Sequence, residues 1–108
     1  MKDRPERMRE HLRTIVSTFV ETESNRTALI TITSVTLSHD FREATFLISV
    51  LPQEHEEEVL HFLRRKRSAC RAYVKERLAS KTIPFVDFAL DEGEKHRQRI
   101  DALLHGDI

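Results

Sequence analysis

The chain has 108 residues, of which 33% are charged and 39% are apolar, and its formal net charge at neutral pH is zero. This length supports one hydrophobic core but not two, and the composition is too apolar for a disordered chain. A single cysteine, Cys70, excludes an internal disulfide and favours a reducing compartment. The N-terminus is too charged for a signal peptide and no apolar run reaches membrane-spanning length, so we expect a cytoplasmic protein.

The first half of the sequence predicts a helix followed by a β-hairpin. Apolar residues recur at helical spacing after Arg4-Pro5, a favourable helix start, and this helix should end near residues 22–25. The next apolar run, residues 28–37, changes phase by one residue, which predicts a strand with a bulge near Thr33-Ser34. Strict alternation over residues 44–50 then predicts a second, antiparallel strand.

The second half predicts an interrupted helix, a third strand and a short terminal helix. The acidic run Glu54–Glu58 follows Pro52 and suits the positive end of a helix. The apolar stripe of this helix fails at residues 64–68 and then resumes until about Ser80, which predicts a kink or a break. Residues 84–90 alternate as a strand, and residues 94–104 carry the pattern of a short helix.

The order α-β-β-α-α-β predicts an α+β sandwich, in which helices cover one face of a three-stranded sheet. Each predicted strand has one apolar face, and only a common sheet buries these faces together. We therefore expect the third strand to pair with the hairpin. The resulting core should combine residues of the first helix and of two strands: Leu12, Ile15, Phe19, Phe46, Ile48, Val86 and Phe88.

Positive charge is concentrated where the apolar stripe fails. Residues 64–81 contain eight Lys or Arg against one acid, a local charge of +7, whereas residues 1–63 carry −4 and residues 82–108 carry −3. A basic face of this density predicts a phosphate-rich partner, and a guanidinium can bond a phosphate with two N–H groups or stack on a base. We expect the solvent-facing RNA-binding residues to be Arg64, Arg65, Lys66, Arg67, Arg71 and Lys75, with Arg4 and Arg7 as a possible extension along the first helix.

Catalysis and metal binding have little support in the sequence. Ser38-His39-Asp40 contains the residue types of a catalytic triad, but adjacent residues cannot align as a relay, so a turn is expected. The six histidines lack metal-ligand spacing, and two glycines cannot build a phosphate-cradling loop. Cys70 lies on the apolar stripe and should be a core residue, and Asp87 lies off the apolar face of its strand and should be solvated. We expect no enzyme, cofactor or metal.

A series of short strings spans residues 4–104 in a characteristic order. The strings are Arg4-Pro5-x-Arg7, Val35-x-Leu37-Ser38-x-Asp40, Ala44-x-Phe46-x-Ile48-x-Val50-Leu51, Arg71, Pro84-x-Val86-x-Phe88-x-x-Asp91 and Arg99-Ile100-Asp101-x-Leu103-Leu104. Together they resemble ribosome-binding factor A, a bacterial and organellar family of small-subunit assembly factors with a KH-like (type II) fold. That family kinks its helix pair with an Ala-x-Gly element, where this chain has Lys66-Arg67-Ser68.

The resemblance implies a single KH-like domain over residues 1–108, with a core at 4–92 and a tail at 93–108. It implies a monomer that binds the immature 30S subunit through 16S rRNA near its 3′ end and assists late maturation and rRNA processing. Release before translation, with assembly GTPases among the partners, is implied as well. It also implies no RNA grip by a Gly-x-x-Gly loop. From the residues alone, the alternative is a protein-interaction module whose basic face binds an acidic protein.

Overall fold

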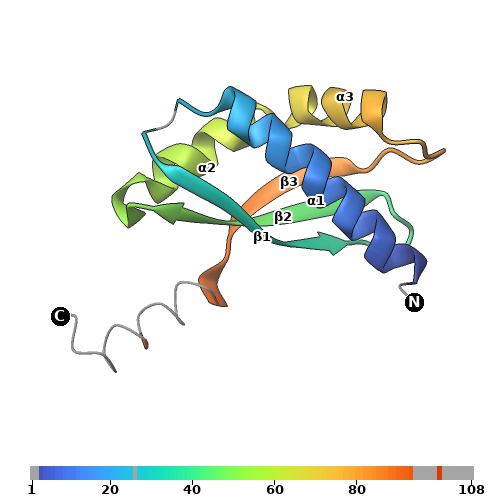
Figure 1. Cartoon of the computed structure of the whole chain (residues 1–108), viewed down its shortest axis with the longest axis horizontal. Coiled ribbons are helices and arrows are strands. Elements are labelled where there is room, and N and C mark those ends of the chain that lie inside the picture. The colour runs from blue at the N-terminus through green and yellow to red at the C-terminus, as the bar shows by residue number, and fades with distance from the viewer. Residues whose placement is uncertain (1–2, 26, 94–99, 101–108) are drawn as a thin grey trace.

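The computed structural model describes residues 3–25, 27–93 and 100, and these form an α+β sandwich. The elements are α1 (Arg4–Glu23), β1 (Leu29–Leu37), β2 (Glu43–Leu51), a short 3-10 helix η1 (Gln53–His55), α2 (Glu56–Arg65), α3 (Arg67–Arg77) and β3 (Phe85–Leu90). The helices lie together on one face of a twisted sheet (Figure 1), so the predicted order and class are confirmed. The terminal helix predicted at residues 94–104 lies, apart from Ile100, outside the described residues.

The first helix begins at a side-chain cap. The backbone N–H of Glu6 donates to Asp3 Oδ1 at 2.8 Å, and a proline occupies the first turn, where its missing N–H costs no hydrogen bond. The apolar stripe of α1 packs on the sheet and buries Leu12, Ile15, Val16, Phe19 and Val20. None of the helices in the described part of the chain is both long and apolar enough to cross a membrane.

The hairpin contains the predicted bulge. β1 and β2 are antiparallel, and their register shifts between Ile32 and Ser34, so that Thr33 is the extra residue. The Thr33 hydroxyl donates to a carboxylate oxygen of Asp91, and its oxygen also lies 3.2 Å from the Leu47 carbonyl oxygen. The bulge is therefore tied to the point where the chain leaves the sheet.

The connection between β1 and β2 is a turn, as expected for Ser38-His39-Asp40. Asp40 Oδ1 accepts from the Ser38 hydroxyl at 2.9 Å and from the Arg42 N–H at 3.1 Å. These two hydrogen bonds hold the pKa of the Asp40 carboxyl below its usual value. The serine and the aspartate thus serve the turn, and the histidine has no part in these bonds.

The third strand joins the sheet beside β2, and the strand order is β1-β2-β3. Its pairing with β2 is parallel, and the two intervening helices provide the crossover that this requires. The Phe46 and Phe88 rings lie 5.9 Å apart at the centre of the core. All seven expected core residues are buried, and the core is completed by residues of the helix pair, among them Leu63, Cys70 and Val74, and by Leu78 directly after α3.

The helix pair is broken at Lys66, as the failed apolar stripe predicted. Lys66 has φ −96° and ψ 7°, which interrupt α-helical geometry between α2 and α3. Its N–H donates to the Leu63 carbonyl at 3.0 Å, the tighter spacing of a 3-10 turn, and its carbonyl accepts from Cys70 at 2.8 Å. The break forms without a small-residue pair, and α3 ends at Arg77, three residues before the predicted end.

Candidate nucleic-acid interface

Three of the basic residues gather on one face of α3. Arg67, Arg71 and Lys75 are spaced four residues apart, so their side chains lie one above the other along the helix. They line an open groove between α3 and the start of β3, with a volume of about 550 Å³. The groove is completed by Ser68, Ala72, Phe85 and Val86.

An exposed aromatic ring in this groove was missed by the sequence analysis. Phe85 is the first residue of β3 and is 64% exposed. The guanidinium carbon of Arg71 lies 4.3 Å from the centre of its ring, and Arg71 Nη2 donates to the Ile83 carbonyl at 3.0 Å. The sequence did contain a signal for this exposed ring. Side chains alternate along a strand, so Phe85 points away from the core when its neighbour Val86 points into it.

Asp87 lies off the apolar face of its strand and is half-exposed, as expected, but it also has partners that the sequence did not indicate. Its Oδ1 lies 3.2 Å from Arg67 Nη1 and 3.5 Å from Arg64 Nε, and it also accepts the Phe88 N–H at 2.8 Å. Arg64 Nε in turn donates to the Phe88 carbonyl at 3.1 Å. Arg64 and Arg67 are exposed, as expected, but they also connect the helix junction to the outer edge of β3. The reason is that β3 is an edge strand, so long side chains of the junction reach its backbone.

The other two residues of the run point elsewhere. Lys66 is half-buried, with Nζ 3.9 Å from Glu23 Oε2 and 5.7 Å from the centre of the Phe62 ring. Arg65 is exposed and lines a separate pocket of about 120 Å³ between α2 and the α1–β1 connection. Successive helical residues are rotated by about 100°, so a run of four charges cannot share one groove.

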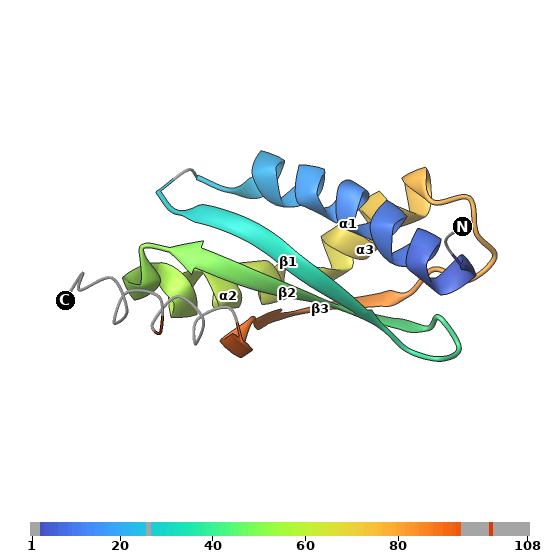
Figure 2. The ribbon, with the colours of Figure 1, turned by 60° about the horizontal axis from the view of Figure 1, so that its bottom comes forward.

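The candidates at the start of α1 lie outside the groove. Arg4 is exposed and its guanidinium carbon lies 5.3 Å from the centre of the Phe41 ring in the hairpin turn, and Arg7 is exposed. In both views the start of α1 and the loop between α3 and β3 lie at the same end of the molecule (Figures 1 and 2). The start of α1, which carries Arg4 and Arg7, therefore lies at the same end of the molecule as the loop between α3 and β3.

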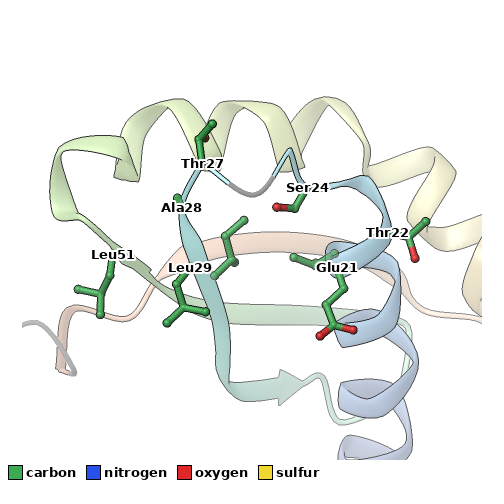
Figure 3. Close-up of a pocket in the computed structure, with 9 residues that line it drawn as sticks. Glu21, Thr22, Ser24, Thr27, Ala28, Leu29 and Leu51 are labelled. Atoms are coloured by element: carbon green, nitrogen blue, oxygen red, sulfur yellow. The ribbon is translucent and has the colours of Figure 1, made fainter.

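A second hollow, of about 650 Å³, has a different character. It lies between the end of α1 and the start of β1 (Figure 3), with Leu29 and Leu51 exposed beside it. Among the described residues that line it, Glu21 is the charged one. Its lining therefore suits a phosphate group less well than the groove at α3.

The remaining reactive groups are explained by the fold. Cys70 is fully buried, as expected of a core residue, and burial raises the pKa of its thiol to about 12. A thiol with so high a pKa supplies almost no thiolate at neutral pH. Within residues 3–25, 27–93 and 100, no group of three or more His, Cys, Asp or Glu side chains could hold a metal ion.

Comparison with known proteins agrees with the resemblance found in the sequence. The family model for ribosome-binding factor A matches residues 4–104. A ribosome-binding factor A from Natranaerobius thermophilus is 30% identical over 104 residues, which cover 94% of this chain and 79% of that protein.

Solved structures show the same architecture. The crystal structure of ribosome-binding factor A from Thermus thermophilus has a TM-score of 0.71 at 21% identity, over 79% of this chain and 93% of that one. A homology model of the Thermus thermophilus factor, fitted into a cryo-EM map of a 30S complex, has a TM-score of 0.65 at 17% identity, over 78% and 91% of the two chains. The fold is KH-like, as expected. The chain belongs to the ribosome-binding factor A family.

Proposed function

We propose that this protein binds the immature 30S subunit through 16S rRNA and assists late maturation and rRNA processing, with the groove between α3 and β3 as its main RNA interface. The observation that carries the proposal is the convergence of Arg67, Arg71 and Lys75 on one groove. Family membership supports the ribosomal partner, and the fitted 30S complex of the Thermus thermophilus factor supports the small subunit.

The residues of the basic run contribute unequally to this interface. Among the described residues, Arg65, Lys75 and Lys81 take part in no ion pair, so their charges are available to phosphates. Arg64 and Arg67 share Asp87, and Lys66 faces Glu23, so part of their charge is neutralised within the protein. Arg4 and Arg7 extend the footprint at the end of the molecule. Phosphate contacts by all of these would position the protein on rRNA without reading its sequence.

The action proposed here is binding, not chemistry. The protein would hold rRNA in an immature arrangement as a monomer in the cytoplasm. Assembly GTPases would help to release it when the subunit is complete. Its binding energy would thereby set the time at which the subunit becomes available for translation.

The test uses a charge reversal that leaves the fold alone. Lys75→Glu changes an exposed groove residue, so we expect thermal unfolding to change little and co-sedimentation with immature small subunits to weaken at least about tenfold. The matched control is Arg13→Glu, the same change of charge on the exposed surface of α1, which should retain most of the binding. Arg64 and Arg67 are poor choices for this test because their replacement also releases β3 from the helix junction.

Two results would contradict the proposal. Equal losses in Lys75→Glu and Arg13→Glu would mean that net charge matters and the groove does not. Undiminished binding by a folded Lys75→Glu variant would move the interface away from α3.

A further inference from the structure

We propose that Phe85 is a platform on which an unpaired base stacks, so that the groove between α3 and β3 selects single-stranded RNA over duplex. This inference rests on the proposed RNA-binding function and specifies the form of RNA that the groove accepts. It assigns a role to Phe85, an uncharged residue that the distribution of basic residues does not indicate.

The first observation is an aromatic ring held at the surface. Phe85 is 64% exposed, whereas its neighbours Pro84 and Val86 are buried and fix the backbone on both sides. The Phe85 N–H donates to the Arg42 carbonyl at 2.8 Å, which anchors the start of β3 to the hairpin. The backbone that carries the ring is therefore fixed, and the ring is presented to solvent at the start of β3.

The second observation is that the Arg71 guanidinium packs against one face of this ring. The Arg71 guanidinium stacks on Phe85 at 4.3 Å and is itself held by its hydrogen bond to Ile83. Because Arg71 covers one face of the Phe85 ring, the exposed surface of the ring is its other face and its edge.

The third observation is the distribution of polar groups around the ring. Lys75 and Arg67 lie on the same face of α3 and line the groove together with Phe85, and Ser68 lines it as well. A nucleotide could thus place its base on Phe85 and its phosphate beside Lys75. The faces of a base in a duplex are covered by its neighbours, so only an unpaired base can use such a ring.

The inference is tested with two replacements at the same position. Phe85→Leu keeps an apolar side chain but removes the aromatic face, and Phe85→Tyr keeps the face. Fluorescence anisotropy measures binding to a labelled single-stranded RNA about eight nucleotides long and to a GC-rich RNA hairpin whose stem has about the same length. We expect Phe85→Leu to weaken single-strand binding about tenfold, the size of one lost stacking contact, and Phe85→Tyr to bind within about twofold of the parent. Duplex binding should be equal in all three proteins.

Leu29→Ala is the matched control, because Leu29 is 65% exposed but lies beside the other hollow. Its single-strand affinity should equal that of the parent, and circular dichroism should show that all variants are folded. The same proteins are also compared for co-sedimentation with immature small subunits, where Phe85→Leu should again be weaker than Phe85→Tyr.

The outcomes separate this inference from the proposed function. If Phe85→Leu matches the parent in both assays while Lys75→Glu loses binding, stacking is wrong and the RNA interface stands. If Phe85→Tyr falls as far as Phe85→Leu, or if duplex binding falls equally, the aromatic face is not what the RNA contacts. If Phe85→Leu and Lys75→Glu both bind normally, the groove is not the interface and both proposals fail.

Discussion

The basic residues at residues 64–75 make different contacts in this protein. Arg64 and Arg67 hold Asp87 and the edge of β3, whereas Arg71 braces Phe85 from within the groove. Lys75 has the length and charge of its neighbours but forms no ion pair with any described residue. The contribution of each side chain to the proposed RNA interface therefore depends on its partners inside the fold.

At the residue scale, Cys70 gives a prediction with a defined sign. Burial raises the pKa of the thiol from 9.0 to about 12, so folding favours the protonated form. The contribution of this group to the free energy of unfolding is complete below the pKa of the thiol in the unfolded chain. It is lost as pH rises from about 9 towards 12. Urea unfolding should show the free energy of unfolding falling across this window more steeply in the parent than in Cys70→Ala. Iodoacetamide should modify Cys70 in urea but not in the native protein, and rapid native modification would contradict its burial.

At the element scale, one carboxylate joins the helix junction to the last strand. Asp87 receives two arginines from the α2–α3 junction and the Phe88 N–H from its own strand. Contacts with the sheet therefore hold the junction in place, although it has Lys66-Arg67-Ser68 in the position of an Ala-x-Gly element. The geometry of the groove, which begins at Arg67, depends on this attachment.

We therefore expect Asp87→Ala to destabilise the fold by about 1 kcal/mol, since it removes two half-exposed ion pairs and a hydrogen bond. Urea unfolding measures the change. The control is Glu76→Ala, which removes one exposed ion pair to Arg77 at 3.4 Å and should cost less than about 0.5 kcal/mol. Equal costs for the two variants would mean that Asp87 does not hold the junction.

The elements were predictable from sequence where their causes are local. The bulge at Thr33 follows from a one-residue change of apolar phase, and the break at Lys66 follows from the loss of the apolar stripe. The partners of Asp87 were not predictable in this way, because Arg64 is 23 positions away and meets it only after the parallel crossover. For the same reason, the basic run predicted a binding face, but only the placement of β3 beside α3 shows which charges share the groove with Phe85.

At the scale of the whole molecule, opposite charges are segregated although the total is zero. The first turn of α2 carries Glu56, Glu57 and Glu58, whereas α3 carries the basic residues of the groove. A ligand with many phosphates would be attracted to one end of the helix pair and repelled from the other. Such a field should orient the protein before contact is made.

This arrangement predicts how RNA binding depends on salt. With about three phosphate contacts on a single strand, affinity should fall roughly 20-fold between about 50 and 200 mM salt. In a plot of log affinity against log salt concentration, Lys75→Glu should reduce the slope by about 0.7, the value of one contact, while Arg13→Glu should leave it unchanged. Anisotropy titrations at several salt concentrations measure both slopes. An unchanged slope in Lys75→Glu would show that Lys75 touches no phosphate.

The parallel pairing of β3 also has a consequence for synthesis of the chain. β1 and β2 pair across a short turn, but β2 gains its second neighbour only when residues 85–90 have emerged. Until then one backbone edge of β2 and the Phe46 ring beside it lack their partners. An unpaired edge of this kind is a site for mispairing between chains. A nascent chain stalled before Pro84 should therefore need a chaperone more than the completed domain does.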